Sequence, residues 1–342
     1  MGATRAWSPV DGRLVSVRLR KAMNLRSDAS TNAFSNIVCR SRPTTVTDNA
    51  RSGAMQRTRG AGLAARLAPF LSLLVAACAS IPLESRGSLS SYQNLAPSDG
   101  ILTKAQVSVS KDEVLAARTI HIIPTAYSAV TGEQSFPEAN LRLIANAIDR
   151  SLCTGLSDRF QIMSDAEPAD LTVHAFITRV IPTDPTAAAA SKVTEAAAQA
   201  ASIVHGITVP SLRIPIGLGG LALEAEAVDR IGGQKAAIMW ARGADSLTTK
   251  ARVSPIGDAY ELASSFGDDF SKLLVTGASP FKTLPSLPTV ERISAMLGGA
   301  PKESACEAFG RAPGVPGFIG RAIGVPPEWT DRGTPPDGQT MR

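Results

Sequence analysis

The most constraining feature of this chain is a short apolar segment that ends in a cysteine. The segment covers residues 67–77, is interrupted only by one proline and one serine, and leads directly into Cys78. The stretch before it, residues 55–66, holds three arginines and no acidic residue. A basic start followed by an apolar run is typical of a secretory signal peptide, and this run is too short to cross a bilayer as a helix. We therefore expect residues 55–77 to be a signal peptide, so that the folded body is built only from later residues.

The residues next to Cys78 indicate which kind of signal this is. Residues 75–78, one aliphatic residue followed by two alanines and a cysteine, resemble the bacterial lipobox. The resemblance implies cleavage between Ala77 and Cys78, and lipidation of Cys78 with acyl chains such as palmitate, which would hold the protein on a membrane. The alternative is a buried core helix that carries a cysteine by chance. Residue 79 is alanine, and an aspartate there commonly retains Gram-negative lipoproteins at the inner membrane. We therefore expect a lipid anchor in the cell outer membrane, on its periplasmic face.

The first part of the chain does not fit a signal that begins at the N-terminus. Residues 1–54 are rich in Arg, Ser, Thr and Asn and show little hydrophobic periodicity. Charge without an apolar pattern does not build a folded module. We expect translation to start at Met55, with residues 1–54 as upstream sequence or a disordered extension. A targeting or nucleic-acid-binding arm is the alternative.

The net charge of the mature chain argues against a nucleic-acid partner. The whole sequence carries 35 Lys and Arg and 30 Asp and Glu. Residues 1–77 hold 12 of the basic and 3 of the acidic residues, which leaves 23 and 27 and a net charge of −4. Nucleic-acid binding needs a basic surface that neutralises phosphates. We therefore expect no nucleic acid among the partners.

Hydrophobic periodicity after the signal predicts alternating strands and helices. The expected order is strand 119–124, helix 138–159, strand 170–180, helix 184–204, hairpin strands 221–229 and 235–242, and a helix from 258 to about 277. Ser135 with Glu138, and Asp258 with Glu261, stand three residues apart as in a capping box. This order predicts one α/β domain over residues 101–277, a mixed β-sheet covered by helices, with an α+β arrangement as the alternative.

Two segments of different composition flank this domain. Residues 78–100 are polar with few apolar anchors, and we expect them to form a tether. Residues 278–342 contain 10 prolines and 9 glycines, which disfavours independent packing. We expect this Pro/Gly-rich tail to lie as an extended strap on its own domain, with a short helix near residues 290–297. A partner-binding motif is the alternative.

Two cysteines remain in the mature chain besides the lipid acceptor. In an oxidising periplasm two such thiols can pair. We therefore predict a disulfide between Cys153 and Cys306, which would tie the tail to the first helix. A buried Cys153 with a free Cys306 is the alternative.

No constellation of catalytic residues stands out. Gly217 to Ala222 contains closely spaced glycines, but an alternating strand follows where a dinucleotide fingerprint needs a helix. His121 and His174 fall on neighbouring predicted strands without acidic or cysteine ligands at metal spacing. Glu224 and Glu226 share one strand face, where we expect them to point outward into solvent. We therefore expect no enzyme activity, no cofactor and no metal.

The segment that follows the lipobox is similar to the start of bacterial lipoproteins grouped as domain of unknown function 3313. The family pattern there is Ser-Gly-hydrophobic-Leu-Ser-Asp-Tyr followed by Leu. The matching residues are Gly87, Leu89, Ser90, Tyr92 and Leu95, while Ser88 and Ser91 depart from it. Strand 120–124, with its proline, and strand 224–229 are also similar, so the resemblance covers about residues 84–275 and leaves the tail out. It implies an envelope lipoprotein to which no activity is assigned.

These observations together predict a binding protein of the cell envelope. We expect a non-catalytic binding or scaffolding module, held on the membrane by its lipid, with another envelope protein or peptidoglycan as partner. The alternative is an envelope hydrolase or a small-ligand-binding lipoprotein whose site is not recognisable from sequence. A third reading, oligomerisation through the Ala-rich helix 184–204, is left open.

Overall fold

The computed structural model describes residues 81–334 except for 129, 132–133, 165–166, 206–212 and 283–288. The N-terminal extension, the signal peptide and the cleavage site at Ala77 and Cys78 lie outside the described residues.

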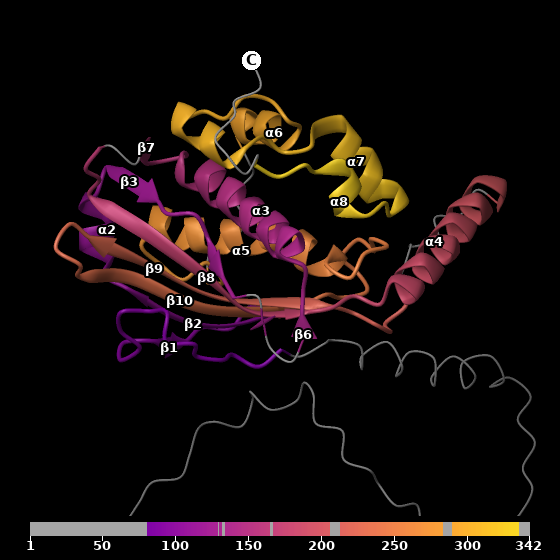
Figure 1. Cartoon of the computed structure of the whole chain (residues 1–342), viewed down its shortest axis with the longest axis horizontal. Helices are drawn as coiled ribbons and strands as arrows, with labels where there is room; N and C mark the ends of the chain where they lie inside the picture. The colour runs from indigo at the N-terminus through magenta and orange to yellow at the C-terminus, as the bar shows by residue number, and fades with distance from the viewer. Residues whose placement is uncertain are drawn as a thin grey trace, which may run out of the picture. The chain divides into compact units, whose positions relative to one another are not determined.

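Eight strands form one mixed sheet in the order β1-β2-β10-β9-β8-β3-β7, with β4 paired to β8 (Figure 1). The strands are β1 Ala96–Pro97, β2 Thr103–Val109, β3 Thr119–Ile122, β4 Ala126–Tyr127, β7 Gln161–Met163, β8 Leu171–Ile181, β9 Gly220–Asp229 and β10 Gln234–Gly243. β3 runs parallel to β7 and β8, and β4 is parallel to β8, whereas the long strands β8, β9, β10 and β2 are antiparallel neighbours. Two further short strands, β5 Val130–Thr131 and β6 Gln134–Ser135, pair only with each other. The predicted mixed sheet with helices is therefore confirmed.

The central hairpin of β9 and β10 forms where the sequence predicts it. Gly232 adopts a φ of 83°, a left-handed conformation that favours glycine. The Asp229 side chain accepts hydrogen bonds from the backbone N–H groups of Ile231 at 3.0 Å and Gly233 at 2.7 Å. These local contacts fix the turn and so the register of the two strands that carry the middle of the sheet.

Two long helices, α3 Glu138–Leu156 and α5 Gly257–Thr276, lie side by side on one face of the sheet (Figure 1). Their backbones approach closely because each carries a glycine at the contact. A Cβ on Gly155 would lie 2.5 Å from the Ser271 Oγ, and a Cβ on Gly267 would lie 2.3 Å from the Ser151 Oγ. Under the helices Trp240 packs edge-on against Phe266, with ring centroids 5.6 Å apart.

The predicted capping boxes are wrong for both of these helices. α3 follows Pro137 and α5 follows Ile256, and neither start has a side-chain cap. Ser135 belongs to β6, and Asp258 forms an ion pair with Arg213 instead. α4, Pro185–His205, does begin as predicted, since the Asp184 side chain accepts from the Thr186 N–H at 2.8 Å.

The second face of the sheet is covered by residues 81–95, which we call the N-terminal strap. Ile81 is 2% exposed and Leu89 is 7% exposed; both pack against the sheet. These residues were expected to belong to a tether over residues 78–100. That expectation differs from the structure because the few apolar side chains of the segment find matching positions on the outer face of β9 and β10.

Residues 289–334, which we call the C-terminal cover, lie over α3 and α5 on the side away from the sheet (Figure 1). They form α6 Val290–Met296, the 3-10 helix η2 Ser304–Phe309, α7 Gly314–Ile323 and α8 Pro327–Thr330. The tail was expected to be an extended strap, and it instead folds into short helices joined at glycines and prolines. A disulfide joins Cys306 of η2 to Cys153 of α3.

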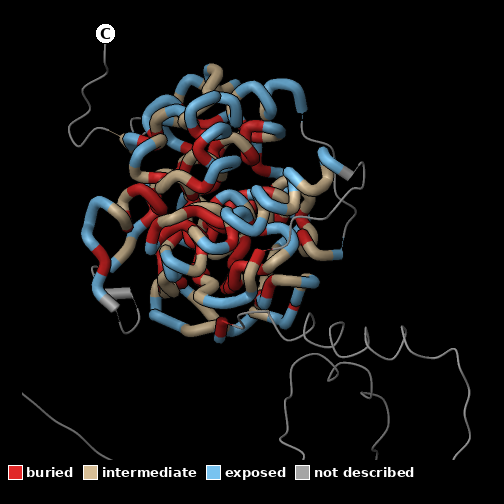
Figure 2. The backbone as a smooth tube through the Cα atoms, turned by 90° about the vertical axis from the view of Figure 1, so that its right-hand side faces the viewer, coloured by how far each residue is buried: buried red, intermediate tan, exposed pale blue. Residues whose placement is uncertain are grey.

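Buried residues gather inside the body between the sheet and the helices (Figure 2). The remaining helices are α2 Lys111–Ala116, which contacts α5, and α4, which leaves the body at the end of β8. Beyond Ser191 no described side chain of α4 is buried, and Val193, Ile203 and Val204 are 70–84% exposed. Within the described ranges, none of the helices combines the length and the apolar character needed to cross a membrane.

A candidate ligand-binding cavity beneath the C-terminal helices

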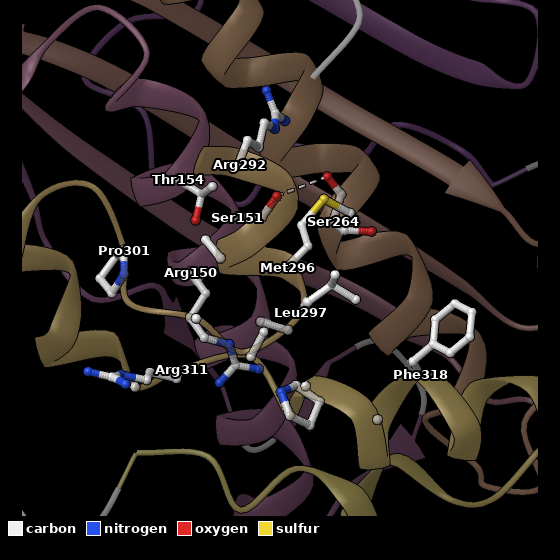
Figure 3. A pocket seen from close by; sticks show the side chains of 18 of the residues that line it. Arg150, Ser151, Thr154, Ser264, Arg292, Met296, Leu297, Pro301, Arg311 and Phe318 are labelled. Atoms are coloured by element: carbon white, nitrogen blue, oxygen red, sulfur yellow. Dashed lines mark hydrogen bonds between the residues drawn. The ribbon is translucent and has the colours of Figure 1, made fainter. Parts of the chain in front are cut away.

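A cavity of about 500 Å³ lies between the C-terminal cover and the helices α3 and α5 (Figure 3). α3 contributes residues 147–154 to its wall, and α5 contributes residues 260–268. α6, the loop after it, and α7 supply the opposite wall. Volumes of about 300–1,000 Å³ are typical of sites for small molecules. The cavity therefore has the dimensions of a ligand-binding site.

The charged side chains that line the cavity are mostly arginines. They are Arg150, Arg252, Arg292, Arg311 and Arg321, with two acids, Glu261 and Asp268. Glu261 is shared between Arg252 at 3.4 Å and Arg321 at 2.6 Å. Arg292 pairs with Asp268, and Arg311 pairs with Glu307 at 2.6 Å. These four arginines therefore all have acidic partners.

Arg150 is the most unusual of these side chains. Its Nη2 forms an ion pair with Asp331, near the end of the described chain, and the Arg150 side chain is only 10% exposed. Its Nη1 is buried and has no hydrogen-bond partner. A buried donor without an acceptor costs about 1–3 kcal/mol. Arg150 thus offers a free, desolvated donor at the cavity wall.

Asp331 holds this arginine and is itself held in place. Tyr260 of α5 donates a hydrogen bond to the Asp331 carboxylate at 2.6 Å. Burial, together with the charge of Asp331, raises the pKa of Tyr260, so the phenol stays protonated and remains a donor. The position of Arg150 is therefore set from both α5 and the C-terminal cover.

Apolar side chains also line the cavity. Ile293, Met296 and Leu297 from α6 and its C-cap, and Phe318 from α7, line it and are 45–66% exposed (Figure 3). Large apolar side chains left open around a concave site favour contact with apolar matter. The cavity thus combines arginines with exposed apolar side chains.

The cavity offers little for covalent chemistry. Its lining includes no histidine, and the hydroxyl of Ser151 donates to the Ser264 carbonyl at 3.1 Å. Asp149, whose pKa burial raises to about 7, points elsewhere and accepts from the Thr125 N–H at 3.0 Å.

The residues that sequence reasoning considered for a metal do not assemble a site. His121 on β3 and His174 on β8 lie on neighbouring parallel strands, and His174 is paired across to Glu226 on β9. Over the stretches that the structure describes, no group of three His, Cys, Asp or Glu side chains could hold a metal ion. The side chain of His205 is outside the described residues. The glycine-rich loop before β9 packs internally, since the Gly219 N–H donates to Asp258 at 2.7 Å.

Glu224 and Glu226 were expected to face solvent, and this is wrong. They are 1% and 6% exposed, because the N-terminal strap covers the sheet face to which they point. The Arg86 N–H donates to Glu224 at 3.1 Å, and the Tyr92 hydroxyl donates to it at 2.9 Å.

The strap also holds Glu226, which lies two residues after Glu224 on β9. It accepts from the Ser90 N–H at 2.9 Å and from the Gln234 amide at 2.6 Å. The Ser88 N–H likewise donates to Glu224 at 3.2 Å, so the two serines and the two glutamates have the same spacing of two residues. This matched spacing was the signal in the sequence that could have revealed the contact.

The strap, the mixed sheet and the helices α3 and α5 define an α/β domain. On one face of the sheet the strap is hydrogen-bonded to Glu224 and Glu226, and on the other face α3 and α5 pack side by side. The model of the family described as "Protein of unknown function (DUF3313)" matches residues 84–270, more than half of the chain. The chain therefore belongs to this family, as the strap residues suggested. The match contains residues 84–95 of the strap, the sheet and α3, and it ends before the C-terminal cover.

More distant likenesses concern the fold only. PelC from Paraburkholderia phytofirmans, solved as a dodecamer, is 9% identical, covers 51% of this chain and 98% of its own, and has a TM-score of 0.29. A DUF4136 family protein from Bacteroides thetaiotaomicron is 12% identical, covers 53% of this chain and all of its own, and has a TM-score of 0.26. No curated protein matches the sequence.

Proposed function

We propose that this protein is an outer-membrane-anchored periplasmic lipoprotein and that its body is a non-catalytic binding module. The sequence favoured a binding or scaffolding module, with an envelope hydrolase or a small-ligand-binding lipoprotein as the alternative. The cavity beneath the C-terminal cover supports a small-ligand-binding module, and its buried, unpartnered Arg150 donor is the observation that carries the proposal. A scaffold would need no cavity with a donor held ready.

The lipid anchor is inferred from the lipobox-like residues that end at Cys78. The strap adds a constraint on how the anchored body would sit. Ile81 is already buried against the sheet, and only Ala79 and Ser80 lie between it and Cys78. The three Cα–Cα steps from Cys78 to Ile81 span at most about 11 Å. The body would therefore lie directly on the membrane surface rather than at the end of a long tether.

The end of the sheet that receives Ile81 would face the membrane. A Cβ on Gly220, at the start of β9, would overlap the Ile81 side chain, so the two are in contact. Leu247, in the turn that follows the adjacent end of β10, is 77% exposed, and Ile101, at the β1–β2 turn, is fully exposed. Exposed apolar side chains next to a lipidated terminus would add contact with the bilayer.

The membrane-extracted protein tests the anchor, and its intact mass is the measurement. We expect a product that begins at Cys78, carries acyl chains and retains the Cys153–Cys306 disulfide. A product that keeps residues 55–77, or a Cys78→Ser variant that stays equally membrane-bound, would refute the anchor. The binding role is tested by native mass spectrometry of protein taken directly from the envelope. An added mass that survives mild extraction and is lost on unfolding would support it, and an empty protein under all extraction conditions would count against it.

A further inference from the structure

The cavity beneath the C-terminal cover combines an unpartnered arginine donor with exposed apolar side chains, and this combination indicates a class of ligand. We propose that the cavity binds a single-chain amphiphile, an acyl chain that ends in an anionic oxygen head group such as a carboxylate or a phosphate. This inference rests on the proposed binding function and specifies what is bound.

The head group is inferred from Arg150. Its Nη1 is the buried donor that lacks a partner, while its Nη2 is occupied by Asp331. A ligand oxygen at this position would restore the missing hydrogen bond. Hydrogen bonds to a guanidinium are strongest when the acceptor is itself charged, and planar carboxylate or phosphate oxygens match its geometry.

The other lining arginines are already paired with acids. Arg292 pairs with Asp268 and contacts Asp158 at 3.5 Å, and Arg311 pairs with Glu307. Arg252 and Arg321 share Glu261. The Nη1 group of Arg150 is therefore the donor on which the inference of the head group rests.

The acyl chain is inferred from the exposed apolar side chains of the cover. Met296 is 60% exposed and Phe318 is 66% exposed, and both line the cavity. An acyl chain would cover these side chains and those of Ile293 and Leu297. Methionine adapts its unbranched side chain to irregular apolar ligands. The acyl chain would therefore bury these side chains, while the Arg150 donor would hold the head group.

Titration calorimetry on the full-length acylated protein in lipid nanodiscs tests the proposal, with empty nanodiscs subtracted. The probes are octanoate, decanoate, dodecanoate and dodecyl phosphate, with dodecanol as the neutral control, all below their micelle-forming concentrations. We expect the two anionic C12 probes to bind at least ten-fold more tightly than dodecanol. We also expect affinity to rise by up to about four-fold per added methylene. Equal binding of dodecanol and dodecanoate would overturn the anionic head group, and the absence of any chain-length dependence would overturn the acyl chain. If dodecanoate and dodecyl phosphate differ, the tighter one identifies the head group.

Two exposed apolar residues of the cover give a matched pair of variants. Met296 lines the cavity, whereas Ile319 is 52% exposed on α7 and does not line it. Met296→Asp should weaken dodecanoate binding at least ten-fold, and Ile319→Asp should leave it unchanged. Arg150→Gln should reduce the preference for dodecanoate over dodecanol, and because Arg150 also holds Asp331, its melting temperature is measured alongside. Equal loss in both aspartate variants would place the binding elsewhere.

Failure of this inference can be told apart from failure of the proposed function. An envelope-extracted protein that carries a ligand of another class, for example a glycan fragment, would keep the binding function and overturn the amphiphile. An unacylated protein that is absent from the membrane would overturn the anchor, whatever the cavity binds.

Discussion

The disulfide between Cys153 and Cys306 offers the sharpest test of how the C-terminal cover is held. The bond closes a loop with a sequence separation of 153 residues. In the chain-entropy model, a loop of this length constrains the unfolded chain by about 5 kcal/mol at 25 °C. The cover has little else of comparable weight, since Cys306 and Phe309 are its only buried side chains in the main hydrophobic core and its other contacts are mostly polar. We therefore expect loss of the bond to lower the free energy of unfolding by up to about 5 kcal/mol.

Thermal unfolding of the acylated protein, followed by circular dichroism with and without reductant, measures the effect. For a folded body of this size, 1 kcal/mol corresponds to about 2–4 °C, so we expect reduction to lower the melting temperature by up to about 10–20 °C. Cys306→Ser is the matched control: it should melt at the temperature of the reduced wild type and should not respond to reductant. Equal melting temperatures for oxidised and reduced wild type would refute the reasoning, because the loop would then be closed by other contacts.

Other positions lend themselves to shorter tests. Glu224→Gln keeps the size of the side chain but sets an amide N–H₂ against the donors of the N-terminal strap, and should lower the free energy of unfolding in urea by about 1–3 kcal/mol. Burial raises the pKa of Asp149 from 3.8 to about 7, so the folded protein binds more protons than the unfolded chain between these values, and stability should fall as pH rises from 4 to 7, by at most about 4 kcal/mol. Asp149→Asn should abolish that slope in urea titrations at successive pH values. Gly267→Ala would push a Cβ into the facing helix and should cost about 1–3 kcal/mol in the same assay, with no loss expected if the helices can separate freely. A fluorophore at Leu247→Cys should be quenched by spin-labelled lipid more than one at Ile231→Cys, although Ile231, at the opposite end of the sheet, is the more exposed residue; equal quenching would contradict the proposed orientation on the membrane.

The parts of the fold that could be predicted from sequence are those fixed by local patterns. The β9–β10 hairpin was readable because alternation and the Gly232 turn act within a few residues. The helix at residues 138–156 was readable from its apolar spacing, since the face it buries is continuous along one element. The capping box predicted for this helix does not form, because Ser135 lies in the short strand β6, which pairs with β5. The one predicted for α5 does not form either, because Asp258 makes an ion pair with Arg213. A local motif is only a preference, and a tertiary partner with charge outweighs it.

The covering segments were misjudged for a common physical reason. The N-terminal strap and the C-terminal cover bury few large apolar side chains, so their hydrophobic signal is weak. The strap is held by polar contacts to Glu224 and Glu226, whose partners lie more than 130 residues away in sequence. The hydrophobic periodicity of a short stretch of sequence cannot show that a distant segment will cover a glutamate on an alternating strand.

The cavity could not be predicted from local sequence patterns either, although the disulfide that links its two sides could. Its walls come from residues near 150, near 260 and near 300, and neither the orphaned Arg150 donor nor the apolar residues of α6 mark a site until these segments are brought together. The pairing of Cys153 with Cys306 is the exception, because it was inferred from the redox compartment and not from any local pattern. That bond joins the two walls of the cavity. If it is lost, the amphiphile site should weaken together with the stability of the cover, since one covalent link serves both.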